Sequence, residues 1–109
     1  MNYNVKTIAI FERQAKRLIK RYPSLRVELM ELIQVLKKEP VQGESLGKNC
    51  YKVRLAISSN GKGKSGGARI MTNLLVTDSI VFLLSIYDKS EKSSISDKEL
   101  IALLKQISS

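Results

Sequence analysis

The sequence predicts an α+β fold in a single domain, residues 1–109, with the element order β-α-α-β-β-β-α. Two consecutive segments near the start repeat apolar residues with a helical period, and three later segments have the pattern of strands. A helix-capping signal then precedes a last apolar stripe. We therefore expect an antiparallel sheet, with an N-terminal helix hairpin on one face and a C-terminal helix.

The first 40 residues are predicted to form a short strand and the helix hairpin. Residues 5–10 are rich in β-branched side chains, and a helical period begins at Phe11. Pro23 ends the first helix and Pro40 closes the second, so the short link between them implies an antiparallel pair. The apolar faces are predicted to contain Phe11, Ala15, Leu18, Ile19 and Tyr22 in the first helix, and Leu25, Leu29, Leu32, Ile33 and Leu36 in the second.

Three strands are predicted in the second half of the chain. Residues 51–57 alternate apolar and polar side chains, as a strand with one buried face does. Residues 68–76 form the next strand, after a Gly-rich hairpin loop at residues 58–67. Residues 79–87 are almost continuously apolar, which indicates a central strand covered on both faces. Thr77-Asp78 is predicted to be a tight turn between the last two strands.

The C-terminal helix is predicted from its N-terminal cap. Ser96 and Glu99 have the spacing of a capping box, in which each side chain bonds the other's backbone amide. The apolar stripe that follows is Leu100, Leu103, Leu104 and Ile107.

Composition narrows the function classes. One cysteine, Cys50, excludes an internal disulfide, and with no histidine the chain has few ligands for a transition metal, so no metal or other cofactor is expected. The N-terminus lacks the pattern of a secretory signal, and no apolar stretch approaches the ~18–20 residues of a membrane span. We expect a cytoplasmic protein that does not enter a membrane. Its net charge of +9 favours nucleic acid as the partner, ahead of an anionic membrane or an acidic protein.

The basic residues concentrate where the chain has no acid. Residues 45–77 contain no Asp or Glu, so we expect an external anion to neutralise their charges. Strand alternation places Lys52 and Arg54 on the face away from the helix hairpin, roughly 7 Å apart, a spacing that suits neighbouring phosphate oxygens. The alternative is a solvated strand face. The six basic residues of this stretch are Lys48, Lys52, Arg54, Lys62, Lys64 and Arg69.

The Gly-rich loop is not a nucleotide-binding P-loop, although it contains Gly63-Lys64-Ser65. The P-loop glycine expected five residues before Gly63 is Ser58 here, and a strand follows where a P-loop has a helix. Its glycines can still form backbone amide nests that bind phosphate together with Lys62 and Lys64. A plain hairpin tip is the alternative.

The segment after the central strand contains Tyr87, Lys89 and Lys92, which could supply a phenol and two further cations to a site. The alternative is a polar loop without a functional role.

Three segments carry a family resemblance: Tyr-Lys-Val-Arg-Leu from residue 51, Gly-Lys-Gly-Lys-Ser-Gly-Gly-Ala-Arg-Ile from residue 61, and Ile-Tyr-Asp-Lys-Ser-Glu-Lys from residue 86. With the order of elements, they resemble the RelE/ParE superfamily of bacterial type II toxins, in particular the HigB-like group of RelE toxins, from about Phe11 to Leu104. The resemblance implies a RelE-like fold and a metal-independent mRNA endonuclease that inhibits translation in the ribosomal A site, where it contacts mRNA and rRNA. It also implies a cognate antitoxin, through which alone operator DNA would be contacted.

The resemblance also implies residue roles. Lys52 and Arg54 match the paired cations of the family's first sheet strand, Arg69 matches the arginine of the next strand, and Lys89 lies near the basic position after the last strand. Tyr87 is the remaining catalytic candidate, although many relatives place a catalytic tyrosine in the C-terminal segment, where this chain has none. Phosphate contacts are assigned to Lys48, Lys62, Lys64 and Lys92.

These residues can support RNA cleavage by the adjacent 2′-OH. Arginine does not deprotonate in proteins, whereas a lysine crowded by other cations loses its proton more readily, so Lys52 is the candidate base. Arg54 and Arg69 suit bidentate contact with the phosphate. The general acid stays open between Lys89, Lys64 and Tyr87.

Two other functions compete with this one. A ParE-like toxin would inhibit DNA gyrase with the same fold, and a non-catalytic basic module would bind RNA without cutting it. In either toxin, a basic open face favours an acidic, partly disordered antitoxin that folds over it.

Overall fold

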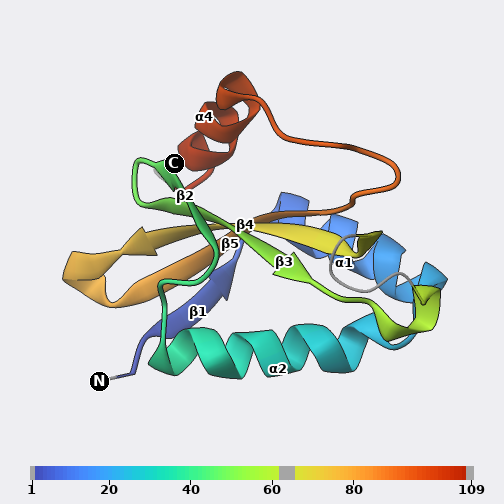
Figure 1. Cartoon of the computed structure of the whole chain (residues 1–109). Helices are drawn as coiled ribbons and strands as arrows, with labels where there is room; N and C mark the ends of the chain where they lie inside the picture. Colours follow the sequence, from blue (N-terminus) through green and yellow to red (C-terminus); the bar gives the residue numbers. More distant parts are fainter. Residues whose placement is uncertain (1, 62–65, 108–109) are drawn as a thin grey trace.

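The computed structural model describes residues 2–61 and 66–107 and has the predicted α+β fold, a five-stranded sheet between helices (Figure 1). The strands lie in the order β1-β5-β4-β3-β2 across the sheet. In chain order the elements are β1 (Asn4–Thr7), α1 (Ala9–Arg21), α2 (Leu25–Lys38), β2 (Glu44–Gly47), β3 (Cys50–Leu55), β4 (Ala68–Leu75), β5 (Ile80–Asp88) and α4 (Asp97–Lys105).

The sheet is mixed, which corrects the expectation of a purely antiparallel one. The β2–β3, β3–β4 and β4–β5 pairs are antiparallel, but β1 pairs in parallel with β5, with Asn4 opposite Ile80. Parallel neighbours need a long connection between them, and here the helix hairpin and three strands provide it. The pairing makes β5 a central strand, as predicted, and seven of its nine residues are buried.

β2 is a strand that the sequence did not predict, and it makes the observed order β-α-α-β-β-β-β-α. It pairs with β3 through a two-residue turn, Lys48-Asn49, in which both residues have positive φ (53° and 57°). This is the backbone geometry of a type I′ hairpin turn, whose twist matches that of the strands it joins. The Asn73 side chain donates a hydrogen bond of 3.1 Å to the Lys48 carbonyl and so ties the turn to β4.

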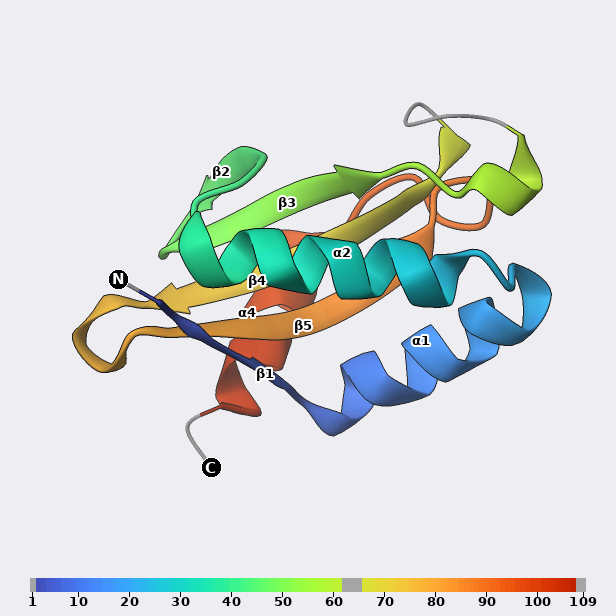
Figure 2. The same ribbon diagram turned by 90° about the horizontal axis from the view of Figure 1, so that it is seen from below.

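The two faces of the sheet carry separate apolar clusters. α1 and α2 cover one face, as predicted, and bury Phe11, Leu18 and Leu25 against the strands (Figure 2). α4 lies on the opposite face (Figure 1) and packs Leu100 and Leu103 on a smaller cluster, which contains Cys50, Met71, Leu84 and Tyr87. The face away from the helix hairpin is therefore partly covered by α4, not open throughout as expected.

α4 begins with the predicted capping box. The Ser96 hydroxyl accepts a hydrogen bond from the Glu99 amide, and the Glu99 carboxylate accepts one from the Ser96 amide. Lys92 forms an ion pair with the same carboxylate, so the segment before the helix is tied to its first turn. None of the helices formed by the described residues has the length and apolar character needed to cross a membrane.

Candidate nucleic-acid interface

A row of three side chains crosses the sheet at the end where β3 and β5 finish. Arg54 lies directly opposite Arg69 on β4, and Arg69 lies directly opposite Tyr87 on β5. Residues that are opposite each other in a sheet share a face, here the face that carries α4, with Cβ atoms about 4.5–5.5 Å apart. The structure thus brings together three of the five predicted catalytic residues. We call the two arginines, Arg54 and Arg69, the cation row.

The members of the cation row differ in exposure. Arg54 is exposed, and no carboxylate among the described residues lies within ion-pair distance of it. Arg69 is only 3% exposed, and its guanidinium donates a 3.1 Å hydrogen bond to the Ala68 carbonyl. Like charges on directly opposite residues cost stability, roughly 0.2–1 kcal/mol, which an anion between them would recover.

Lys52 shares the face of Arg54 and has an acidic neighbour that the sequence did not predict. Its ammonium lies 3.6 Å from the Glu44 carboxylate on β2, which is just outside the acid-free stretch. The expectation that this lysine has no local partner is therefore wrong, because the unpredicted strand brings one. The Glu44 side chain is 64% exposed, and ion pairs so exposed contribute little, so a phosphate can replace it.

Tyr87 lies beneath α4 and is 6% exposed. Its hydroxyl is buried, and no atom of the described residues forms a hydrogen bond with it. Burial raises the pKa of this phenol, the nearby Arg69 opposes that effect, and Glu99 adds to it. In this conformation the hydroxyl cannot touch RNA, so a role for Tyr87 in proton transfer requires α4 to move.

The turn after β5 presents Lys89 to solvent beside the cation row. The Lys89 amide donates a 3.0 Å hydrogen bond to the Gly67 carbonyl, so this turn is held against the start of β4. Lys92 is further along and is engaged by Glu99. Lys48 lies at the β2–β3 turn, at the far end of β3 from Arg54. Lys62 and Lys64 fall outside the described residues, so the phosphate contacts predicted for them stay predictions.

Asp88, beside Tyr87, is a buried carboxylate that sequence reasoning missed. It accepts a 2.7 Å hydrogen bond from the Tyr22 hydroxyl and two from Ser90, one from the amide (2.9 Å) and one from the hydroxyl (2.8 Å). Burial opposes its ionisation, but these hydrogen bonds, that of Tyr22 first, hold the pKa of Asp88 below its ordinary value. No sequence signal connects Tyr22 with Asp88, because the two are 66 residues apart.

The basic face of α1 is also partly engaged. Glu91, in the turn after β5, lies 3.1 Å from the Arg17 guanidinium and 3.2 Å from that of Arg21. These two ion pairs join the end of α1 to the turn that carries Lys89. The arginines of this helix face are therefore neither wholly solvated nor wholly free for an external partner.

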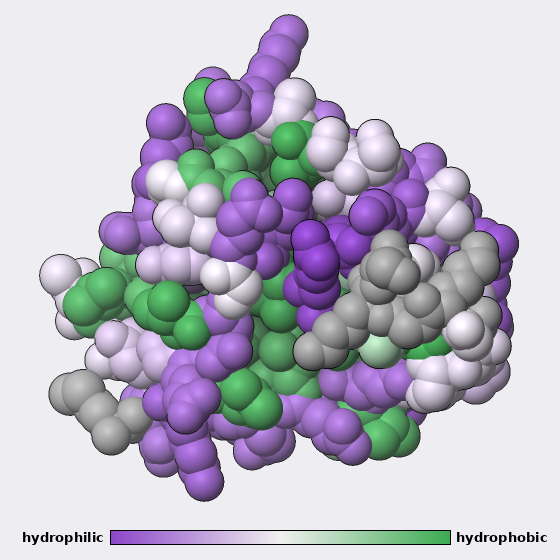
Figure 3. Space-filling model, viewed as in Figure 1, coloured by the Kyte–Doolittle hydropathy of each residue, from purple (hydrophilic) through white to green (hydrophobic). Residues whose placement is uncertain are grey.

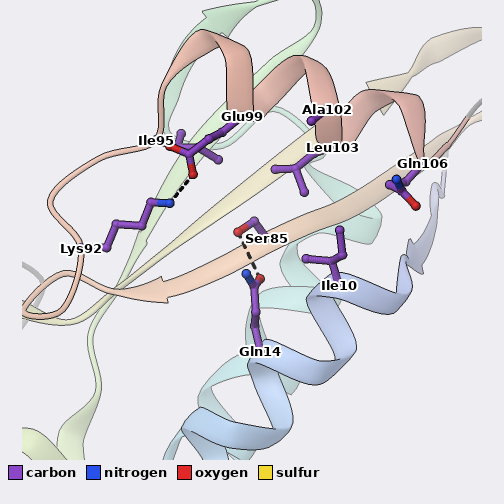
Figure 4. A pocket seen from close by; sticks show the side chains of 9 residues that line it. All are labelled: Ile10, Gln14, Ser85, Lys92, Ile95, Glu99, Ala102, Leu103 and Gln106. Carbon is purple, nitrogen blue, oxygen red and sulfur yellow. Dashed lines mark hydrogen bonds and ion pairs between the residues drawn. The ribbon is translucent and has the colours of Figure 1, made fainter.

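Two hollows flank these elements. One, of about 280 Å³, lies between α4, β5 and the start of α1, where Gln14 accepts a hydrogen bond from Ser85 (Figure 4). The other, of about 520 Å³, is a groove between α1 and α2 with an apolar floor and a rim that includes Lys16, Lys20 and Arg26.

The face viewed in Figure 1 is mainly hydrophilic, with smaller apolar patches over α4 and the β4–β5 turn (Figure 3). No group of three or more His, Cys, Asp or Glu side chains that could hold a metal occurs among residues 2–61 and 66–107.

Comparison with known proteins identifies the family. The family model described as RelE toxin of RelE / RelB toxin-antitoxin system matches residues 6–109, nearly the whole chain. The chain belongs to the RelE toxin family. The expected resemblance to the RelE/ParE superfamily is therefore confirmed. A search of curated proteins finds no match.

Solved structures of RelE toxins share the fold of this RelE-family chain. A free E. coli RelE toxin with two arginines replaced by alanine is 19% identical, with a TM-score of 0.62, over 98% of this chain and 99% of that one. The toxin–antitoxin complex RelBE2 of Mycobacterium tuberculosis provides a chain that is 15% identical, with a TM-score of 0.57, over 81% of this chain and 99% of that one. At such identities the likeness establishes the α+β fold alone.

Proposed function

We propose that this RelE-family toxin is a ribosome-dependent mRNA endonuclease that cuts in the A site and so inhibits translation. The observation that carries the proposal is the cation row, in which Arg54 and Arg69 lie opposite each other on neighbouring strands. A phosphate can contact exposed Arg54 directly, whereas it can reach Arg69, which is 3% exposed, only after the groups that cover this side chain move; both guanidiniums would then donate charge-assisted hydrogen bonds to it. Family membership supports the same reaction class.

The proposed chemistry uses the RNA's own 2′-OH as the nucleophile. Its oxygen attacks the adjacent phosphorus, the bond from phosphorus to the 5′-oxygen breaks, and the products carry a 2′,3′-cyclic phosphate and a 5′-OH. Once Glu44 has been displaced, the Lys52 ammonium gives its own proton to solvent, and the neutral amine then takes the 2′-OH proton. Arg54 and Arg69 stabilise the charge that develops on the phosphorane. Of the two acid candidates among the described residues, Lys89 is exposed and Tyr87 needs α4 to move, while Lys64 stays a candidate outside them.

The test replaces the exposed arginine of the cation row, because a buried arginine such as Arg69 also supports the fold. Arg54→Ala should abolish growth arrest on expression, and Arg13→Ala, which removes an exposed arginine from α1, should leave it intact. Cellular mRNA 5′ ends mapped after induction should show codon-phased cuts with the parent and with Arg13→Ala only. Intact mRNA together with a DNA-damage response would instead support inhibition of gyrase.

We also propose that a cognate antitoxin neutralises the toxin, as the name of the M. tuberculosis complex implies for that pair. The groove between α1 and α2 suits an acidic amphipathic helix, because its lining is mainly apolar and its charged residues are three cations and a single carboxylate, Glu12. Met30, one of those apolar residues, is 61% exposed in the free chain. Lys16→Glu combined with Lys20→Glu should release the product of an adjacent gene during co-purification, whereas Lys37→Glu with Lys38→Glu should not.

A further inference from the structure

The corner between α1 and α2 touches both loops that border the cation row. We define the helix corner as Tyr22, Ser24 and Glu28, which lie at the end of α1, in the link and in the first turn of α2. One bordering loop follows β3 and contains Ser58 and Ser59, and the other is the turn after β5. Both loops leave the sheet at the end where Arg54, Arg69 and Tyr87 lie.

The loop after β3 is bound to the corner by side chains of the second helix and the link. The Ser58 amide donates a 2.8 Å hydrogen bond to the Glu28 carboxylate, and the Ser58 hydroxyl bonds the same oxygen. The Ser59 amide donates a 3.0 Å hydrogen bond to the Ser24 hydroxyl, which in turn donates to Glu28. Although burial opposes ionisation of Glu28, the hydrogen bonds from Ser58 and then Ser24 hold its pKa below the ordinary value.

The turn after β5 is bound to the same corner through a buried charge. The Tyr22 hydroxyl donates to Asp88, which is fully buried, and whose backbone carbonyl accepts the Glu91 and Lys92 amides at 3.0 and 3.1 Å. Because alternate residues of a strand face opposite ways, anchoring Asp88 on the helix side sets how Tyr87 and the turn are presented on the other side. A buried carboxylate is costly to retain unless its hydrogen bonds are made, so this anchor has one favoured geometry.

We infer that the helix corner positions the RNA-cleaving site, with Tyr22 and Glu28 as positioning residues that fix the turn after β5 and the loop after β3 relative to Arg54. The inference rests on the proposed function. In-line attack on a phosphate needs the base, the phosphate ligands and the acid in register, and a misplacement of about 1 Å costs about 100-fold in rate. The helix corner is hydrogen-bonded to both loops that border the cation row. Its residues act through these loops and not by contact with the RNA.

The test measures single-turnover mRNA cleavage on programmed ribosomes with two conservative variants and two matched controls. Tyr22→Phe and Glu28→Gln should each lower the maximal rate about 10- to 100-fold while the toxin concentration for half-maximal rate changes less than about threefold. Tyr3→Phe, at the opposite end of the sheet, and Glu31→Gln, on the exposed side of α2, should cleave at the parental rate.

A third variant tests whether the cleavage rate can fall without loss of fold. Glu91→Gln changes only an exposed carboxylate that pairs with two arginines of α1, and it should lower the maximal rate several-fold with an unchanged melting temperature. Parental rates in Tyr22→Phe, Glu28→Gln and Glu91→Gln, while Arg54→Ala is inactive, would overturn the positioning role and leave the proposed function standing. A rate that falls only in proportion to unfolded protein would overturn it as well. A parent that does not cleave on programmed ribosomes would overturn both proposals.

Discussion

Gly43 offers a direct test of how the strand that carries Lys52 is held. It lies between α2 and β2 with φ +81°, and a Cβ built on it would be 2.1 Å from the Lys52 carbonyl oxygen and 2.9 Å from the carbonyl carbon. Gly43→Ala therefore costs about 1–2 kcal/mol for the left-handed backbone and about 1–3 kcal/mol more to displace the main chain of β3. We expect the free energy of unfolding to fall by about 2–5 kcal/mol in total.

Gly47 provides the matched control. It has the same φ of +81°, but a Cβ there meets nothing within 4 Å. Gly47→Ala should therefore cost only the backbone strain, about 1–2 kcal/mol. Urea unfolding followed by circular dichroism gives both free energies, and the slope of each transition checks that the unfolded state is unchanged. Equal losses in the two variants would show that contact with the Lys52 backbone contributes nothing, and would refute the reasoning.

Three further predictions concern buried groups. Tyr87→Phe removes a buried hydroxyl without a partner among the described residues, so urea unfolding should show stability unchanged or raised by up to about 1–3 kcal/mol. Hydrogen bonds overcome the effect of burial and lower the pKa of Asp88 in the folded chain. The free energy that its ionised form contributes to folding is therefore present above about pH 4 and is lost as pH falls through that lowered pKa. Tyr22→Phe should accordingly be about 1–2 kcal/mol less stable than the parent at pH 7, and the difference should shrink as acid protonates Asp88; a difference that stays constant down to acid unfolding would contradict this. Burial raises the pKa of the Cys50 thiol, so its labelling by a disulfide reagent at pH 7 should follow the rate of unfolding; fast labelling of the folded chain would argue otherwise.

The elements that the sequence predicted are those with local signals. The helix hairpin follows from two apolar periods, the first ended by Pro23 and the second by Pro40, and α4 follows from the Ser96–Glu99 capping box. β2 was missed because Glu-Ser-Leu-Gly has neither alternation nor β-branched residues, and its pairing with β3 depends on the Lys48-Asn49 turn. The parallel pairing of β1 depends on the whole intervening chain, which no local pattern reports.

In the candidate site, too, the sequence predicted the residues that a local pattern places and missed the partners that come from distant segments. Alternation along β3 was enough to place Lys52 and Arg54 on one face, and β4 then brought Arg69 opposite Arg54. The partners that restrain these residues come from distant segments. Glu44 reaches Lys52 only because β2 exists, and Tyr22 reaches Asp88 only because α1 ends beside the end of β5. Such contacts follow from tertiary packing, so a single sequence does not display them.

The central claim is that the toxin cuts A-site mRNA by attack of the RNA's own 2′-OH. The most direct measurement uses ribosomes programmed with two mRNAs that differ by one 2′-deoxy substitution at the cleaved A-site nucleotide. The account predicts that the unmodified mRNA is cut to a 2′,3′-cyclic phosphate and a 5′-OH, and that the substituted mRNA is bound but stays intact at that position. Equal cleavage of both mRNAs would contradict the account.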